Sequence, residues 1–347
     1  MEKTTENLLI WYAKHKRNLP WRESINPYQI WLSEIILQQT RVDQGTAYYL
    51  RFISAFPTVF DLAKADEESV LKLWQGLGYY SRARNLRLAA QMVVEKFNGQ
   101  FPTSYDLLLT LKGVGPYTAA AIASIAFNEP VPVVDGNVFR VISRLMASDL
   151  PIDRPSGLKF TREQMLRLIP SNEPGNFNQA VMELGAMVCK PVNPDCNACP
   201  IQTQCLAHAS KITSNLPVKA GKQKVTALNI RYAMVIFKDQ IMVRLRSEKG
   251  IWQGLYDFPE LTFEHDEIGC LHEAESLFGT KMTFVKRSST FTHLLSHRRI
   301  SADVFVLQAE QLPIIGKDCQ LIALSALTTV PVPRLVEKML PLAENLI

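Results

Sequence analysis

Apolar positions repeat with a helical period through residues 1 to about 210, with little sustained alternation. Spacings of i, i+3, i+4 and i+7 place apolar side chains on one face of a helix. Short connections rich in Gly, Pro and Asn separate the segments that show this period. The segments with the period are 61–74, 82–97, 116–127, 137–147 and 175–188. The first part of the chain is therefore predicted to be helical.

The pattern changes after a polar, basic stretch, SNLPVKAGKQKV, which we predict to be a linker at 214–225. Beyond it, alternating or β-rich runs predict strands, and Lys-Asp-Gln predicts a hairpin turn between the first two. The predicted strands are 228–237, 240–246, 282–287 and 298–308. Helical patches near 266–278 and 333–345 complete an α+β domain.

One predicted helix carries a carboxylate at the border of its apolar face. In WLSEIILQQTRV, residues 31–42, the apolar stripe includes Trp31 and Ile35, and Glu34 lies beside it. A half-buried Glu costs free energy unless it is paired, hydrogen-bonded or protonated. The alternative is that Glu34 reaches solvent at the edge of the stripe, and these residues alone leave both interpretations open.

Residues 111–118, LKGVGPYT, have two glycines two apart, a proline suited to a first helical turn, and a small-residue helix after it. This order is typical of a helix–hairpin–helix, whose backbone N–H groups bind a DNA phosphate. An ordinary glycine-rich turn between two helices would give the same letters.

Asp135, in PVVDGNVFR at 132–140, comes directly before a predicted helix. Asp at that position commonly caps the helix. Its carboxylate could also face a cationic reaction centre, and the two roles are compatible.

Residues 74–84, WQGLGYYSRAR, place apolar and aromatic side chains on a glycine loop, with a plausible cap at Ser81 and arginines beyond it. Such a loop suits a wedge between base pairs with phosphate contacts alongside. The alternative is a loop whose aromatic side chains fold back onto the core.

The 347 residues are 47% hydrophobic and 20% charged, which predicts buried cores in two or three domains. A formal charge of +5 permits an anionic partner. No apolar run is long enough for a transmembrane helix, and the N-terminal residues lack the pattern of a secretory signal, so we expect no membrane attachment and a bacterial cytoplasmic location.

Four of the six cysteines lie within seventeen residues with the spacing C-x6-C-x2-C-x5-C, and these are Cys189, Cys196, Cys199 and Cys205. Such a group can surround one metal centre, and the spacing alone leaves zinc and an iron–sulfur cluster open. Cys270 and Cys319 stand alone and are expected to be buried, inert thiols.

Taken together and in this order, these segments resemble the helix–hairpin–helix DNA glycosylases of the endonuclease III superfamily and, more narrowly, the adenine DNA glycosylases of the MutY family. The resemblance covers nearly the whole chain. It implies a multidomain fold: an all-α glycosylase region at 1–213, with a six-helix barrel-type and a cluster subdomain, a linker at 214–225, and a C-terminal α+β Nudix-like domain at 226–347. It also implies that the four clustered cysteines hold a [4Fe–4S] cluster.

The resemblance implies roles for particular side chains. The residues around the sugar and the catalytic carboxylates would be Glu34, Asp135, Tyr117 and Asn137. The base pocket would be formed by Trp21, Arg22 and Gln179. The DNA-binding and intercalating residues would be Gln39, Thr40, Leu77, Tyr79, Ser81, Arg82, Lys112, Gly113, Val114 and Gly115. Relatives that also cut the strand carry a Lys where this chain has Tyr117, and a phenol cannot form the Schiff base that a Lys amine forms.

In the C-terminal domain, GIWQGLYDFPE at 250–260 resembles the region before the Nudix signature, but the carboxylate-rich core that would hold Mg²⁺ is absent from the sequence. A hydrolase is therefore not expected, and a recognition domain is. In the family this domain recognises 8-oxoguanine through a short loop, here FTHLLSHRR at 291–299. The usual Phe-Ser-His corresponds to Leu295, Ser296 and His297, so an aromatic contact is lost and a hydroxyl is kept. His293 and His297 could equally be solvent-facing loop residues.

The implied activity is that of a monofunctional glycosylase, expected to act as a monomer, that removes adenine opposite 8-oxoguanine or guanine from double-stranded DNA. An endonuclease III-like pyrimidine glycosylase and lyase is the alternative enzyme, disfavoured by Tyr117 and the added domain. A non-catalytic damage-binding or redox-sensing protein is disfavoured because both Glu34 and Asp135 are present.

Overall fold

The computed structural model describes residues 2–221, 225–262, 266–295 and 298–344. In these ranges no helix is both long and apolar enough to cross a membrane. The chain forms two compact units. Unit 1 consists of residues 1–64 and 85–221, and unit 2 consists of residues 65–84 and 222–347. The predicted domain boundaries stay a prediction, and residues 65–84, predicted within the helical region, belong to unit 2.

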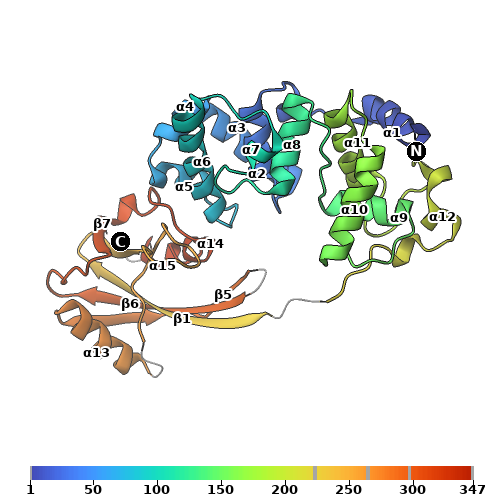
Figure 1. Cartoon of the computed structure of the whole chain (residues 1–347). Coiled ribbons are helices and arrows are strands. Elements are labelled where there is room, and N and C mark those ends of the chain that lie inside the picture. The colour runs from blue at the N-terminus through green and yellow to red at the C-terminus, as the bar shows by residue number, and fades with distance from the viewer. Residues whose placement is uncertain (1, 222–224, 263–265, 296–297, 345–347) are drawn as a thin grey trace. The chain divides into compact units, whose positions relative to one another are not determined.

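Unit 1 is helical (Figure 1). Its α-helices are α1 Glu2–His15, α2 Pro27–Ile36, α3 Val42–Ala55, α4 Val59–Lys64, α6 Ser81–Phe97 (from Asn85 onward), α7 Tyr105–Leu108, α8 Pro116–Phe127, α9 Gly136–Leu145, α10 Pro155–Leu168, α11 Pro174–Met187 and α12 Leu206–Ala209. Three 3₁₀ turns join them, η1 Pro20–Arg22, η2 Gln202–Gln204 and η3 Thr213–Asn215.

One core of unit 1 lies among α1, α9, α10 and α11. It includes Leu8, Ile142, Met165, Phe177 and Leu184, all at most 4% exposed. Each such side chain contributes about 1.5–3 kcal/mol when it is buried. Because α9 begins directly after Asp135 and α11 carries Gln179, this core fixes two elements that the sequence assigns to a functional site.

The predicted helices at 82–97, 116–127, 137–147 and 175–188 are confirmed to within two residues by α6, α8, α9 and α11. The single helix predicted at 61–74 is wrong. It is two helices, α4 and, in unit 2, α5 Glu67–Trp74, because the Asp66 carboxylate accepts a hydrogen bond of 2.7 Å from the Ser69 N–H and caps α5.

Unit 2 contains a seven-stranded mixed sheet of order β3-β2-β1-β6-β4, with β5 paired to β6 and β7 paired to β2. Its strands are β1 Thr226–Phe237, β2 Gln240–Leu245, β3 Tyr256–Asp257, β4 Met282–Arg287, β5 Phe291–Leu294, β6 Arg298–Ala309 and β7 Cys319–Ala323. The central pair β1 and β6 is parallel, with Tyr232 opposite Val304, and the other pairs are antiparallel. Helix α13 Glu267–Phe278 packs against β4 and β6 (Figure 1).

The four predicted strands and the hairpin between the first two are confirmed by β1, β2, β4 and β6. The sequence missed β3, β5 and β7, which are two to five residues long and show too little alternation to be recognised. The helical patch at 266–278 is confirmed by α13. The patch at 333–345 is two short helices, α14 Arg334–Glu337 and α15 Pro341–Glu344, beyond a short 3₁₀ turn η4 Leu324–Ala326.

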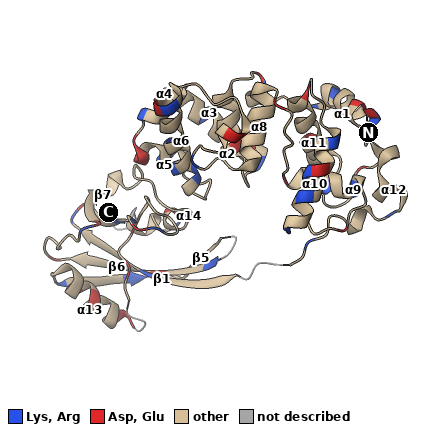
Figure 2. Cartoon of the chain, in the orientation of Figure 1, with Lys and Arg blue, Asp and Glu red and all other residues tan. Residues whose placement is uncertain are grey.

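Basic and acidic residues are interspersed along the helices of unit 1 and over unit 2 (Figure 2). Of the formal charge of +5, unit 1 carries +4 and unit 2 carries +1. A modest positive charge of this kind attracts a polyanion weakly, and specific contacts must supply the rest of the affinity.

Candidate active site

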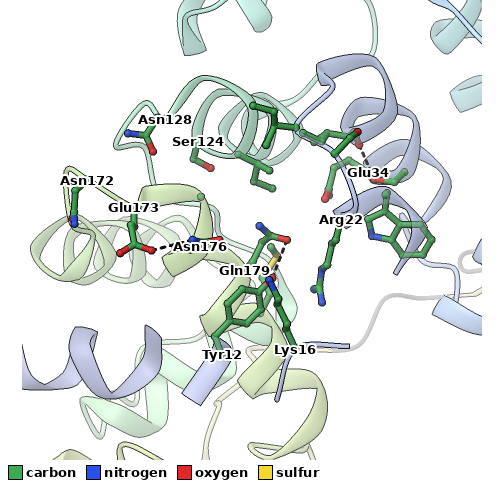
Figure 3. A pocket seen from close by; sticks show the side chains of 18 residues that line it. Tyr12, Lys16, Arg22, Glu34, Ser124, Asn128, Asn172, Glu173, Asn176 and Gln179 are labelled. Atoms are coloured by element: carbon green, nitrogen blue, oxygen red, sulfur yellow. Dashed lines mark hydrogen bonds between the residues drawn. The ribbon is translucent and has the colours of Figure 1, made fainter. Parts of the chain in front are cut away.

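A cavity of about 260 Å³ opens in unit 1 between the N-terminal segment and α11. Figure 3 shows Arg22 and Glu34 on one side of it and Gln179 and Asn176 of α11 on the other. Trp21, Arg22 and Gln179, the three residues predicted for a base pocket, all line this cavity together with Glu34. The structure therefore brings together four predicted site residues that are up to 158 positions apart in the sequence.

Glu34 reaches the cavity because α2 buries the opposite side of its turn. The helix begins at the Asn26 cap, whose side chain accepts a hydrogen bond of 2.9 Å from the Tyr28 N–H, and Trp31 and Ile35 are at most 4% exposed. Glu34 is half-buried and lines the cavity. The alternative that Glu34 simply reaches open solvent at a helix edge does not describe this position.

Burial raises the pKa of Glu34 from its ordinary 4.5 to about 7. The Tyr117 hydroxyl, which donates a hydrogen bond of 2.6 Å to Glu34 Oε2, and the charge of Arg22 oppose this rise, whereas the negative charge of Asp135 adds to it. A carboxyl with a pKa near 7 exchanges a proton readily at neutral pH, as a general acid must.

Tyr117 lies in the first turn of α8 and is fixed by its hydroxyl contacts. Besides the bond to Glu34, the hydroxyl lies 3.7 Å from the sulfur of Met182, which also lines the cavity. Burial, with the neighbouring carboxylates, raises the pKa of Tyr117 well above its usual range. The phenol therefore keeps its proton at neutral pH and acts as a hydrogen-bond donor.

Asp135 is the N-cap of α9, as the sequence predicts. Its Oδ1 accepts a hydrogen bond of 2.7 Å from the Val138 N–H, and its Oδ2 accepts one of 2.7 Å from Asn137 Nδ2. Arg140 Nη2 in turn donates to Asn137 Oδ1 at 2.8 Å. Burial raises the pKa of Asp135, and these hydrogen bonds oppose that rise. The cap thus fixes a carboxylate whose charge acts on Glu34.

Three buried residues that support the site were missed by the sequence analysis. Glu183 forms ion pairs with Arg17 and Arg22. Arg140 donates a hydrogen bond to Asn137 and so orients it. The Asn178 side chain accepts a hydrogen bond of 3.1 Å from the Val133 N–H, and it donates to the Ser124 hydroxyl and to the Val131 carbonyl. Asn178 therefore holds the segment that leads to Asp135. Only the spacing of polar residues on apolar helix faces could have indicated these roles, and that spacing does not name their partners.

The predicted hairpin has the geometry of a backbone anion site. Gly113 has φ +74°, a backbone conformation that favours glycine. A Cβ at this position would also lie only 2.6 Å from the Cβ of Asn85, so both the backbone conformation and the available space require glycine. No side chain caps α8 at Gly115, and Pro116 occupies its first turn. The first N–H groups of α8 therefore lack a capping side chain, while Lys112 is exposed beside them.

Two of the predicted intercalating residues lie in unit 1, directly after α2. Gln39 is exposed with φ +57°, and the Thr40 N–H donates to the Leu37 carbonyl at 3.1 Å. They form a tight turn that projects a polar side chain.

Leu77 and Tyr79 lie on the glycine loop of unit 2. Gly76, Gly78 and Tyr79 all have positive φ, and Trp74 Nε1 donates to the Gly78 carbonyl at 3.0 Å. Tyr79 is 46% exposed, so the alternative in which it folds back onto the core does not hold for this side chain.

Arg82 braces the same loop. Its Nη2 donates to the carbonyls of Leu77 and Gly78, and its guanidinium lies over the rings of Trp74 and Tyr79. Burial lowers the pKa of Arg82 to about 10. The predicted cap at Ser81 is wrong by one position, because Ser81 is the first residue of α6 and the Tyr80 carbonyl accepts the first bond, from the Arg84 N–H.

A second, mostly apolar cavity of about 480 Å³ lies within unit 2. Leu77, Tyr79, Trp252, His293 and Leu295 all line it. The sequence predicts a loop at 291–299. Residues 291–294 instead form β5, which pairs antiparallel with β6. The Leu295 N–H donates a hydrogen bond of 2.8 Å to the Arg298 carbonyl. Ser296 and His297 lie outside the described residues. His293 is half-buried beside Trp252, and burial, with the charges of Lys338 and Arg334, lowers its pKa. The alternative of a solvent-facing loop residue does not hold for His293.

The four clustered cysteines line a further small cavity of unit 1, about 30 Å³ in volume. Arg144 of α9 joins them: its Nη1 donates to Cys189 Sγ at 3.3 Å, and its carbonyl accepts from Cys205 Sγ at 3.3 Å. Burial, with the neighbouring cysteines, raises the pKa of Cys199 to about 12. Neighbouring thiols oppose one another's ionisation because two thiolates repel. A bound cationic centre would instead favour the ionised thiolates.

A metal ion held by four thiols requires the sulfurs to lie close together. Four sulfurs around one tetrahedral zinc, with Zn–S of about 2.3 Å, must approach one another to about 3.8 Å. In the part of the chain that the structure describes, no three Cys, His, Asp or Glu side chains are arranged to hold one metal ion. The four thiols nevertheless line one small cavity, and their placement does not distinguish a zinc ion from a multi-iron group.

Residues 32–163 match the family model described as "HhH-GPD superfamily base excision DNA repair protein". The hairpin and the helical unit define the same class of protein. Residues 231–342 match the model "NUDIX domain". Adenine DNA glycosylase of Buchnera aphidicola subsp. Baizongia pistaciae is 34% identical over 298 residues, covering 84% of this chain and 82% of that protein. Human adenine DNA glycosylase is 35% identical over 370 residues, covering 89% and 67%. The chain belongs to the adenine DNA glycosylase family.

Solved structures agree with the helical fold. A thermostable thymine-DNA glycosylase is 27% identical with a TM-score of 0.55, and covers 60% of this chain and 95% of its own. An endonuclease III in a non-covalent DNA complex, 24% identical with a TM-score of 0.51 and the same coverage, shares the fold.

Proposed function

We propose that the chain is a monofunctional DNA glycosylase that hydrolyses the N-glycosidic bond of adenine mispaired with 8-oxoguanine or guanine. The observation that carries the proposal is a carboxyl group of pKa about 7, Glu34, in a cavity that also presents Arg22 and Gln179. Family membership supports the same activity.

The reaction begins when adenine leaves the base stack, at a cost of a few kcal/mol. Adenine is a poor leaving group as an anion, so the carboxylic acid of Glu34 donates its proton to N7 as the glycosidic bond stretches. At neutral pH about half of a group with pKa 7 holds that proton. The Tyr117 hydroxyl, bonded to Oε2, orients the acid.

Positive charge develops on the deoxyribose as the bond breaks. Asp135 supplies the compensating negative charge, held in place by the α9 cap and by Asn137. Water then attacks the sugar carbon and gives its proton to the Glu34 carboxylate, which restores the acid. One acid and one anion thus take part, as in other glycoside hydrolyses. Trp21, Arg22 and Gln179 line the space for the base.

The hairpin at Lys112, Gly113, Val114 and Gly115 supplies backbone N–H groups and one cation to a phosphate. Leu77 and Tyr79 are proposed as intercalating residues of unit 2, and Gln39 and Thr40 as intercalating residues of unit 1. Tyr79 is exposed on a loop that Arg82 braces from within, which supports insertion by the tyrosine and assigns Arg82 to loop support.

The hairpin of β5 and β6, with Leu295 and His297 flanking Ser296, is the proposed reader of 8-oxoguanine. Its support is sequence correspondence with the family, together with the cavity that Leu295 shares with the wedge residues Leu77 and Tyr79. The hydroxyl of Ser296 suits the lesion's N7–H or O8 edge.

We further propose that Cys189, Cys196, Cys199 and Cys205 hold a [4Fe–4S] cluster. When bound, the cluster supplies a compact, positively charged iron core that keeps the four thiolates together. The spacing of the four cysteines and their shared lining of one cavity support it. Iron analysis with a broad absorption band near about 400 nm would support the cluster, whereas stoichiometric zinc without that band would contradict it.

We propose that the protein acts as a monomer on double-stranded DNA in a bacterial cytoplasm, at the nucleoid. The positive charge and the phosphate-binding geometry of the hairpin support a DNA substrate. An elution volume that matches a dimer would contradict the monomer.

The deciding experiment compares two duplexes, one with A opposite 8-oxoguanine and one with thymine glycol opposite A, each with and without hot alkali. Strand breaks that appear only after alkali, and only in the first duplex, are expected. Breaks without alkali would indicate the endonuclease III-like lyase, and no base release would leave a binding protein.

A further inference from the structure

Glu183 of α11 is a buried carboxylate, 1% exposed, that does not line the cavity itself. Its Oε1 accepts hydrogen bonds from Arg17 Nε at 2.7 Å and from the Arg17 N–H at 3.0 Å. Its Oε2 accepts from Arg17 Nη2 at 2.8 Å and from Arg22 Nη2 at 2.9 Å. One carboxylate therefore holds two guanidinium groups.

Glu183 stays ionised despite its burial. Burial opposes ionisation, but the hydrogen bonds and charges of Arg17 and Arg22 outweigh it and lower the pKa of Glu183 to about 2. Breaking such a buried pair from one side leaves an uncompensated charge, so the arrangement has a strongly preferred geometry.

The consequence falls on Arg22, which does line the cavity. Its Nη2 is committed to Glu183, its Nη1 donates to the Arg17 carbonyl at 3.3 Å, and its guanidinium lies over the Tyr12 ring at 5.7 Å. The Tyr12 hydroxyl donates to Gln179 Oε1 at 3.1 Å, and Gln179 is another polar residue that lines the pocket. Glu183 thus holds Arg22, one of the two cations at the wall of the cavity, with Lys16; both are labelled in Figure 3.

We propose that Glu183 is a positioning residue: it fixes the Arg22 guanidinium at the wall of the pocket, so that an extruded adenine is held where the Glu34 proton can reach it. This inference rests on the proposed function. It goes beyond a fold-stabilising clamp between residues 17–22 and α11, which the same hydrogen bonds would also provide.

The test uses Glu183→Gln in the full chain, with Arg17→Gln as the matched control. Arg17 shares the carboxylate of Glu183 but does not line the cavity. Duplex affinity and the single-turnover rate of adenine release are measured separately, with the melting temperature of each variant. For Glu183→Gln we expect duplex affinity close to that of the wild type and a release rate about tenfold or more lower, because small misplacements of a reacting group have effects of that size.

Arg17→Gln is expected to lower the melting temperature as much as Glu183→Gln does. Its rate of adenine release should stay close to that of the wild type. In an Arg22→Gln background, Glu183→Gln should lower the rate no further, since its effect acts through Arg22.

Equal rate losses in Glu183→Gln and Arg17→Gln would overturn the inference and leave only a clamp. Additive losses in the Arg22→Gln background, or an unchanged rate in Glu183→Gln, would overturn it as well. A wild-type protein that releases no adenine would overturn the proposed function together with the inference, so the two failures are distinguishable.

Discussion

The Tyr117 hydroxyl donates a hydrogen bond of 2.6 Å to Glu34 Oε2, and this bond favours the ionised form of a carboxyl group that burial otherwise keeps protonated. The two effects act in opposite directions, and burial is the larger. The resulting pKa of about 7 places the titration of Glu34 in the physiological range.

Tyr117→Phe removes the hydrogen bond but keeps most of the ring. Because the bond lowers the pKa of Glu34, its loss should raise that pKa further, and the alkaline limb of the rate of adenine release should move to higher pH. Single-turnover rates between pH 6 and about 9 for both proteins would show this. A limb that stays in place, or moves to lower pH, would contradict the assigned direction.

Glu34→Gln should abolish adenine release and keep binding to the lesion duplex, since Gln has nearly the same shape but no proton to give. Turnover comparable with the wild type would defeat the assignment of Glu34 as proton donor.

The same variant has a stability consequence. A carboxyl whose pKa is about 7 when folded and 4.5 ordinarily stabilises the fold below pH 4.5, and this contribution is lost as pH rises through 7. Gln has no such dependence. The melting temperature of Glu34→Gln minus that of the wild type should therefore be larger at pH 8 than at pH 5. An equal difference at both pH values would indicate an ordinary pKa.

Asp135→Asn separates capping from chemistry. Asn caps a helix about as well as Asp, so urea unfolding should show nearly wild-type stability while adenine release is lost. The control Asp135→Ala should lose about 1 kcal/mol of stability as well. An active Asp135→Asn variant would reduce the role of Asp135 to the cap alone.

Ser296→Ala should weaken the preference for A opposite 8-oxoguanine over A opposite guanine, through loss of the hydroxyl that pairs with the lesion edge. The ratio of the two single-turnover rates measures this preference, and Thr292→Val, which removes an exposed hydroxyl of β5, is a suitable control. An unchanged ratio for Ser296→Ala would remove Ser296 from the proposed reader.

The helical period of apolar residues predicted most of unit 1. Helices α2, α8 and α9 also begin at residues typical of helix starts, which are the Asn26 cap, Gly115 with Pro116, and the Asp135 cap. The break inside 61–74 was missed because its signal, Asp66 bonded to Ser69, is short and polar within a continuing apolar stripe. Three strands were missed because they are too short to show alternation.

Long-range partners could not be predicted in the same way. Glu183 lies 161 positions from Arg22 in the sequence, and nothing near either residue identifies the other. The raised pKa of Glu34 likewise depends on burial by segments that only the folded chain brings together. Residue type and periodicity pointed to Glu34 but left its role open, and the family resemblance implied that role. Its proton affinity depends on the assembled cavity.

Direct titration of Glu34 in the resting protein is the most decisive measurement. Carboxyl carbons labelled with ¹³C are followed by NMR from acid to alkaline pH, and Glu34→Gln assigns the signal of Glu34 by its disappearance. A midpoint near pH 7 is expected, and Tyr117→Phe should shift it upward. A midpoint near the ordinary 4.5 would show Glu34 ionised at neutral pH and would contradict its role as the acid that protonates adenine.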